Sequence, residues 1–322
     1  MEKQTLVFRN AYICKKKLFM QLLAYCLAFP LLWLVSKLPF SVIYILSDLI
    51  YFFVYRVFGY RKTTVRKNLA LALSEKSDEE RLQIEKDFYK HMCDMFLEMV
   101  KSLSMTDEEM KRRFTFSNLE LISEYEKKGK SIILMCAHYA SWEWLMILSN
   151  YITFESYAIY KKIGNRYFDA LVRKIRGQHN AKLIESKKSI ETMELHKEQG
   201  IRAFYGFASD QSPQLAKAKY WDKFMGIEVP VYTGAEMLAK RLDMNMLFVK
   251  VEKIKRGYYQ ATLVPLVDEP IKVPDYEITS LYLREVEKQI LDKPEHYFWT
   301  HKRWKHIGKK KLVNKKSTTA RI

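Results

Sequence analysis

The chain has 322 residues, a length that fits one large domain with appendages or two small domains. Its composition, 48% hydrophobic and 14% aromatic, excludes a disordered chain, and its mean hydropathy of −0.25 excludes a polytopic membrane protein. The formal net charge of +18, from 55 Lys and Arg against 37 Asp and Glu, favours polyanionic partners: nucleic acid, an anionic lipid surface or an acidic carrier protein.

The N-terminal region is predicted to contact a membrane. Residues 18–35 read LFMQLLAYCLAFPLLWLV, about the ~18 residues of a short transmembrane helix, with Gln21 as the only strongly polar side chain. Residues 41–60 are also apolar but contain Asp48 and many aromatics, which favours an interfacial or packed helix. No convincing cleavage site follows, so we expect the segment to be retained. Residues 1–60 are therefore predicted to form a membrane anchor that either spans the bilayer or lies in it.

The next segment is predicted to be helical. Two capping residues, Ser77 and Thr106, are each followed by acidic side chains that suit the first turn of a helix. No strand signal interrupts the helical pattern from residue 61 to about residue 126. We therefore expect residues 61–128 to form a helical lead-in to the main domain.

Beyond residue 129 short apolar runs alternate with helical patterns, which is typical of an α/β domain with a mostly parallel central sheet flanked by helices. Residues 132–136, IILMC, form a continuous apolar run of the kind found in buried parallel strands. The other predicted elements are strands at residues 157–160, 201–208, 245–251 and 258–264 and helices at residues 168–176 and 234–242. Residues 129–305 are predicted to form the domain core, and residues 306–322 a basic tail.

Signals for several chemistries are missing. The cysteines form no CxxC pair, which gives no support for a disulfide framework or a thiolate zinc site. The sequence contains no G-x-S-x-G, P-loop, G-x-G-x-x-G or H-E-x-x-H motif, so serine hydrolases, NTPases, dinucleotide enzymes and zinc proteases lack positive support. Three histidines recur every five residues without acidic or cysteine partners, and we interpret them as surface or interface residues rather than a metal site: His296, His301 and His306.

His138 is the first candidate catalytic residue. It directly follows the strand predicted at residues 132–136, and open α/β sheets bind ligands at the carboxyl ends of their strands. On one continuous helix His138 and Glu143 would lie about 140° apart, so they meet only if His138 lies in a loop. Glu143 could then accept from one imidazole nitrogen while the other takes a proton from an alcohol. Alternatively, backbone groups satisfy His138, and Glu143 stabilises a helix N-terminus.

Residues 137–144, AHYASWEW, resemble the His-x4-acid motif of the lysophospholipid acyltransferase superfamily, in the branch of bacterial lipid A late (lauroyl/myristoyl) acyltransferases. Three further segments resemble segments of this family and occur in the same order, so that the resemblance covers nearly the whole chain: residues 60–62 with 68–69, residues 209–213 and residues 299–305. The resemblance implies a glycerol-phosphate-acyltransferase-like fold and O-acyl transfer from a thioester, expected on acyl carrier protein, to a hydroxyl of a lipid A precursor. It also implies that His138 is the general base and Glu143 its orienter, without an acyl-enzyme or a cofactor.

The resemblance implies three more candidate site residues. Arg176 matches a functional arginine, which would stabilise the thioester oxygen or hold a lipid phosphate, although a solvated helix arginine is the alternative. Asp210 matches an acidic turn that orients substrate or braces the site, and the alternative is a turn aspartate bonded to its own backbone. The family often has an Arg-Pro pair where this chain has Lys161 and Lys162, so Lys161 would supply a point charge without bidentate geometry.

Other functions remain open at this point. The His-x4-Glu motif does not determine which lipid head group is recognised, so a lysophospholipid or another membrane amphiphile is an alternative acceptor. A non-enzymatic membrane or nucleic-acid binding protein is the alternative of another class, because Trp299, Trp304 and the C-terminal lysines could stack on and neutralise a single strand. No recognised nucleic-acid module accompanies them, so we expect no nucleic acid partner. We expect a lipid acceptor, an anionic membrane surface and acyl carrier protein, with the catalytic domain on the cytoplasmic side of the bacterial inner membrane.

Overall fold

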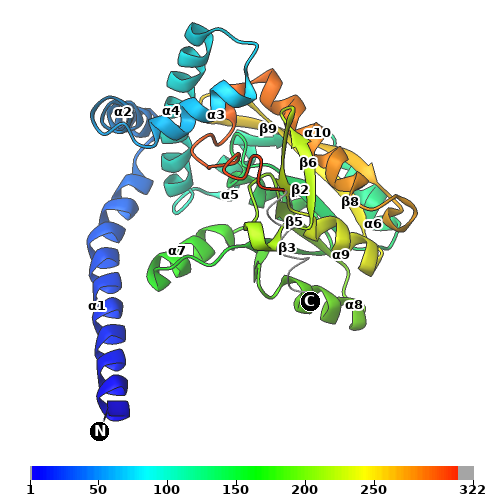
Figure 1. Cartoon of the computed structure of the whole chain (residues 1–322), viewed down its shortest axis with the longest axis horizontal. Coiled ribbons are helices and arrows are strands. Elements are labelled where there is room, and N and C mark those ends of the chain that lie inside the picture. Colours follow the sequence, from blue (N-terminus) through cyan, green and yellow to red (C-terminus); the bar gives the residue numbers. More distant parts are fainter. Residues whose placement is uncertain (1, 311–322) are drawn as a thin grey trace.

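The computed structural model describes residues 2–310, apart from the side chains of residues 2–17, so most of the predicted basic tail lies outside the described residues. A β-sheet forms the centre of the protein (Figure 1). It has seven strands in the order β1-β9-β8-β2-β5-β3-β4. All neighbours in it are parallel except β8 and β9, which confirms the predicted α/β class. The strands of this sheet are β1 (Phe114–Phe116), β2 (Ile132–Cys136), β3 (Glu155–Tyr160), β4 (Ala181–Glu185), β5 (Ala203–Ala208), β8 (Asn245–Lys255) and β9 (Tyr258–Val267).

The remaining elements surround this sheet. A separate antiparallel hairpin consists of β6 (Tyr220–Phe224) and β7 (Ile227–Val231). The α-helices are α1 (Glu2–Lys37), α2 (Phe40–Tyr51), α3 (Lys62–Ala72), α4 (Asp78–Lys101), α5 (Asp107–Arg113), α6 (Glu120–Lys127), α7 (Arg166–Arg176), α8 (Ser189–Glu198), α9 (Gly234–Leu242) and α10 (Glu277–Asp292). A π-helical segment, η1 (Phe52–Val57), continues α2, and short 3-10 helices are η2 (Trp144–Tyr151), η3 (Leu215–Lys217), η4 (Pro270–Lys272) and η5 (Pro294–His296).

Strand β2 lies in the middle of the sheet, between β5 and β8. Ile132, Ile133, Leu134 and Met135 are all buried, because a central strand of a parallel sheet is covered on both faces. A continuous apolar run is therefore the pattern that such a strand requires, and the predicted bounds of β2 are confirmed. The predicted bounds of α9 are confirmed as well.

The lead-in region is mostly helical, with both predicted caps in place. The Ser77 hydroxyl accepts from the Glu80 backbone in a full capping box, and Thr106 accepts from the backbone of Glu109. The expectation of an uninterrupted helical region is wrong, because β1 forms within it and pairs in parallel with β9. A strand of only three residues has no periodicity of its own, and its partner lies far along the chain.

Two N-terminal helical stretches are long and apolar enough to cross a membrane by length and composition, Leu18–Lys37 and Phe40–Val57. The first has a mean hydropathy of 2.1 and the second of 1.6. Helix α1 extends along one side of the protein, with α2 at its C-terminal end (Figure 1). Both stretches expose large apolar side chains, which fits association with a membrane.

Candidate active site

The sheet register brings His138 and Asp210 together. Strands β2 and β5 are parallel neighbours, with Cys136 opposite Ala208. His138 and Asp210 each stand two positions beyond these residues, so both emerge at the same carboxyl edge. The Asp210 Oδ1 atom lies 2.7 Å from Nδ1 of His138 and also accepts from the His138 backbone N–H at 3.2 Å.

Asp210 sets the electrostatics of the histidine. Burial by itself lowers the pKa of His138, but the charge and hydrogen bond of Asp210 outweigh burial and raise the pKa above its ordinary value. Burial raises the pKa of Asp210, whereas His138 and backbone donors lower it to below its ordinary value. Asp210 therefore stays ionised and fixes a proton on Nδ1 of neutral His138. The Nε2 atom is then the basic nitrogen.

Glu143 contacts Arg176, and not His138 as the sequence analysis expected. Glu143 precedes the short helix η2, and its carboxylate binds the Arg176 guanidinium through two hydrogen bonds, of 2.8 and 2.5 Å. Trp142 also donates its indole N–H to Glu143, at 3.1 Å. These donors occupy both oxygens of Glu143, so its carboxylate contacts Arg176 and Trp142. His138 does lie in the loop before the helix, as expected, but its partner is Asp210.

A cavity of about 540 Å³ adjoins these groups. Its polar lining includes four of the sequence-predicted site residues, namely His138, Glu143, Lys161 and Arg176. The fifth, Asp210, is not part of the lining, but its chain neighbours Ser209 and Gln211 and its hydrogen-bond partner His138 are. The rest is largely apolar and includes Leu134, Leu145, Leu148, Ile152, Ile159, Phe204 and Phe207. The pocket therefore suits a ligand with an apolar body and one polar, reactive end.

The pocket also contains a thiol, Cys136, at the end of β2. Burial, followed by the charges of Asp210 and Glu143, raises the pKa of this thiol to about 12. Since only the thiolate is a good nucleophile, Cys136 is poorly suited to form a covalent intermediate.

The C-terminal segment holds the His138 loop in place. The backbone N–H of Phe298 donates to the carbonyl of His138 at 3.1 Å, and Ala140 donates to the carbonyl of His296 at 2.9 Å. The Phe298 ring packs edge-on against Trp142, which in turn packs edge-on against His138. Asn68 of α3 fixes the same segment by donating to two of its carbonyl groups, each at 2.8 Å.

This arrangement rules out one alternative for the C-terminal region and gives His301 a hydrogen-bond partner. Trp299 and Trp304 are almost fully buried, at 0% and 4% exposure, so they do not offer rings to a nucleic acid strand. His301 is half-buried, and its Nε2 atom accepts from the Ser212 backbone, next to the Asp210 turn, at 3.1 Å. Burial lowers the pKa of His301 to about 4, so it remains a neutral acceptor. Sequence reasoning missed the contact of His301 with Ser212 because the spacing of the histidines does not reveal their partners.

Comparisons with known proteins identify the family of the chain. The sequence model described as bacterial lipid A biosynthesis acyltransferase matches residues 13–306. The chain is 25% identical over 281 residues to the lipid A biosynthesis lauroyltransferase of Escherichia coli (strain K12), covering 87% of this chain and 90% of that protein. It is 22% identical over 278 residues to the lipid A biosynthesis palmitoleoyltransferase of the same organism and to the lipid A biosynthesis acyltransferase of Shigella flexneri, covering 85% of this chain and 88% of each relative. The chain therefore belongs to the bacterial lipid A biosynthesis acyltransferase family and is an acyltransferase.

Proposed function

We propose that this acyltransferase moves a fatty acyl group from an acyl thioester to a hydroxyl of a lipid A precursor, with His138 as general base. One observation carries the proposal: His138, which is hydrogen-bonded to Asp210 through Nδ1, lines an apolar pocket and leaves its Nε2 for a substrate. A positioned base with a fixed tautomer is what the deprotonation of an alcohol requires. Asp210 replaces Glu143 as the residue that orients the base.

In the proposed reaction Nε2 takes the proton of the acceptor hydroxyl while its oxygen attacks the thioester carbonyl carbon. The carbon–sulfur bond then breaks, and the proton passes from His138 to the departing thiolate. The imidazolium that exists between these events is stabilised by Asp210 at 2.7 Å. Because the high pKa of Cys136 keeps that thiol protonated, we propose direct transfer without an acyl-enzyme. No cofactor is required by this scheme.

The Arg176–Glu143 pair would serve the polar part of the substrates. Glu143 holds the guanidinium fork in one orientation, so Arg176 can direct its remaining N–H groups toward a thioester oxygen or a lipid phosphate. Lys161 follows β3 at the same edge of the sheet and would add a flexible point charge. The apolar remainder of the pocket would hold the acyl chain.

We propose acyl carrier protein as the donor and the cytoplasmic face of the inner membrane as the location. A net charge of +18 suits an acidic carrier protein and an anionic lipid surface equally. The names of the relatives favour lipid A over a lysophospholipid as acceptor. No observation at the pocket favours a non-enzymatic binder over an enzyme.

The direct test uses purified protein with a lipid A precursor and two donors, acyl carrier protein and coenzyme A, carrying the same acyl chain. Mass spectrometry should detect an acylated lipid A precursor formed faster from the carrier protein than from coenzyme A. Equal rates would remove the carrier protein as the preferred donor. Acylation of a lysophospholipid but not of the lipid A precursor would overturn the proposed acceptor.

A further inference from the structure

The 2.7 Å contact between His138 and Asp210 joins two segments that lie beyond the last paired residues of their strands. The ladder between β2 and β5 ends at Cys136 and Ala208, two positions before the base and its partner. Displacing a catalytic group by about 1 Å costs on the order of 100-fold in rate. Contacts from other parts of the chain that hold both segments are therefore expected to affect catalysis.

Tyr282 of α10 bridges the two strand ends directly. Its hydroxyl donates to the carbonyl of Cys136 at 2.8 Å and accepts from the backbone N–H of Ser209 at 3.2 Å. The first group stands two positions before the base, and the second stands one position before the carboxylate that meets it. The Tyr282 side chain is 1% exposed, and its ring packs edge-on against Phe248. Because one oxygen atom bonds both segments, it limits how far they can separate.

His301 forms a second bridge between the same two segments. Its Nε2 atom accepts from the backbone N–H of Ser212 at 3.1 Å, two positions beyond Asp210. The backbone N–H of His301 donates to the carbonyl of Phe298 at 3.3 Å, which closes a tight turn. The backbone N–H of Phe298 donates in the opposite direction, to the carbonyl of His138 at 3.1 Å. One short turn therefore contacts the base at its start and the segment of the carboxylate at its end.

This turn is tied in its own place by the start of α3. The Asn68 side chain, 4% exposed, donates to the carbonyl groups of Trp299 and His301, each at 2.8 Å. Arg61, which precedes α3, donates to the carbonyl of Thr300 at 3.1 Å. The three consecutive carbonyl groups of the turn are thus all bonded to the lead-in region. A turn held in this way can transmit a fixed position to the groups it contacts.

We propose that Tyr282 and His301 are positioning residues of this acyltransferase, which hold the segment after β5 against the His138 loop and so keep Asp210 within hydrogen-bond distance of the base. Over residues 2–310, neither side chain belongs to the lining of the pocket, so neither is placed to touch a substrate. They act on the reaction through the geometry of the two residues that they hold. This role rests on the proposed function, in which His138 is the base.

Both positioning residues are neutral near pH 7. Burial raises the pKa of Tyr282 well above its ordinary value and lowers the pKa of His301 to about 4. Besides burial, the charges that shift the pKa of His138 are those of Asp210, Glu143 and Arg176, and neutral substitutions at the two positioning residues leave all three in place. Further titratable groups face the pair or His301 from the C-terminal segment and also remain: Tyr297, Arg303 and Lys305. A shifted pKa of the base in such variants therefore reports a changed contact with its carboxylate partner.

The first test is Tyr282→Phe in the purified full-length protein, which removes the bridging oxygen and keeps the ring. Its kcat should fall roughly 10-fold, about the effect of one hydrogen bond, with KM changed less than about twofold. The acidic limb of kcat/KM should move to lower pH, because a weaker contact with Asp210 lowers the pKa of His138. The matched control is Tyr259→Phe, also at a position 1% exposed, which loses a 2.7 Å hydrogen bond to Glu98 outside the pocket. That control should lose stability and keep both kcat and the limb.

The second test compares two variants of His301. His301→Leu removes the acceptor for the Ser212 backbone, so kcat should fall roughly 10-fold and the acidic limb should move to lower pH. His301→Gln offers a carbonyl oxygen to the same N–H group and should recover most of the lost rate. Equal losses in the two variants would show that His301 serves packing alone. Thermal midpoints establish that each variant is folded, and this pair decides the matter by itself if Tyr282→Phe does not fold.

An NMR titration of the His138 imidazole, in protein with isotope-labelled histidine, separates these results from the proposed function. The titration midpoint should move to lower pH in Tyr282→Phe and His301→Leu and stay in place in Tyr259→Phe, whether or not His138 is the base. An unchanged midpoint in both of the first two variants would overturn their positioning role. Normal turnover of His138→Ala would instead overturn the proposed base and leave the measured contact unaffected.

Discussion

His91 is buried and His138 is half-buried, and their neighbours give the two histidines opposite properties. The Nδ1 atom of His138 meets a carboxylate, Asp210, at 2.7 Å, whereas Nδ1 of His91 accepts from the ammonium of Lys253 at 3.2 Å. The pKa of His138 is accordingly raised, while burial and then the positive charge of Lys253 lower the pKa of His91 far below its ordinary value.

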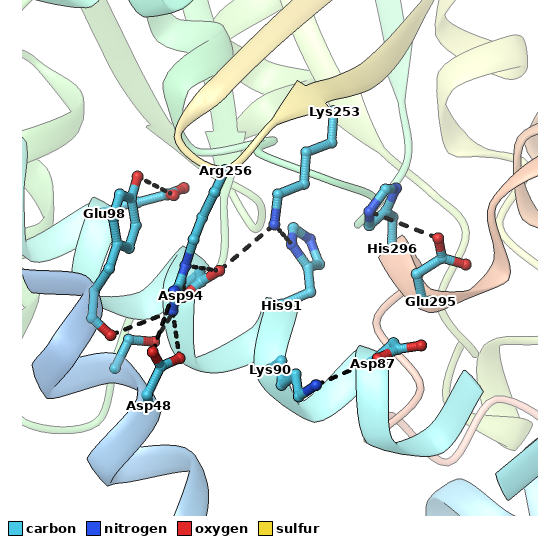
Figure 2. Close-up of polar contacts among 12 residues, drawn as sticks. Asp48, Asp87, Lys90, His91, Asp94, Glu98, Lys253, Arg256, Glu295 and His296 are labelled. Carbon is cyan, nitrogen blue, oxygen red and sulfur yellow. Dashed lines mark hydrogen bonds and ion pairs between the residues drawn. The ribbon is translucent and has the colours of Figure 1, made fainter. Parts of the chain in front are cut away.

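The two histidines also differ in what surrounds them. His91 belongs to a network on α4 in which Lys253 and Arg256 both approach Asp94 (Figure 2). Ser47 also donates to Asp94, and none of these residues lines the pocket. His138 lines the pocket and its side chain retains 24% exposure. A buried polar group whose neighbours are all protein serves stability, whereas one that faces a cavity with a free nitrogen can do chemistry.

The largest expected difference between them concerns turnover. His138→Ala should lower kcat on the order of 100- to 10,000-fold, because a positioned base contributes that much. His91→Ala should keep kcat within a few-fold and lower the thermal midpoint instead, since it leaves a cavity next to His296. Acyl-transfer kinetics of the purified, folded variants decide this, and near-normal turnover of His138→Ala would contradict the mechanism.

The next effect concerns pH. Neutral His138 is the active base, so activity should fall as pH drops through its raised pKa, and the acidic limb of kcat/KM should lie above 6.5. Asp210→Asn removes the charge that raises this pKa, so the limb should move to lower pH while kcat falls on the order of 100- to 10,000-fold. A pH–rate profile measures both. An acidic limb that does not move would show that Asp210 acts only on structure.

A smaller effect is expected at Arg176. Lysine cannot reproduce the two hydrogen bonds to Glu143, so Arg176→Lys should lower kcat/KM roughly 10-fold. The matched control Arg173→Lys, exposed on the same helix, should change kcat/KM less than about twofold. Glu143→Gln should resemble Arg176→Lys if the carboxylate acts through Arg176. A loss as large as that of His138→Ala would instead restore Glu143 as a partner of the base.

The smallest effect on turnover is expected in the network. Asp94→Asn removes the charge shared by Arg256 and Lys253, and breaking a buried ion pair costs about 3–5 kcal/mol. Denaturant unfolding should detect that loss, with kcat of the folded variant within a few-fold of wild type. A large fall in kcat without loss of stability would show that the network contributes to catalysis. The network would then no longer differ from His138 in function.

Much of the fold was predictable from local patterns, and the failures share one cause. The run at residues 132–136 identifies β2 because a strand covered on both faces must be apolar throughout. Strand β1 was not predictable, since its three residues are extended only through pairing with β9, more than 140 positions later. The burial of Trp299 and Trp304 likewise depends on contacts with distant segments, such as the hydrogen bond of Trp304 to Phe224.

By itself, the sequence determined the α/β class, the position of His138 just after a central strand and the presence of two apolar N-terminal stretches. These features depend on local composition and on chain order. Only the tertiary structure decided that Asp210 rather than Glu143 meets His138, because the partner is set by the register of β2 against β5. It also decided that both apolar stretches lie along the protein body, since that outcome depends on contacts between α1 and α7 and between α2 and α4.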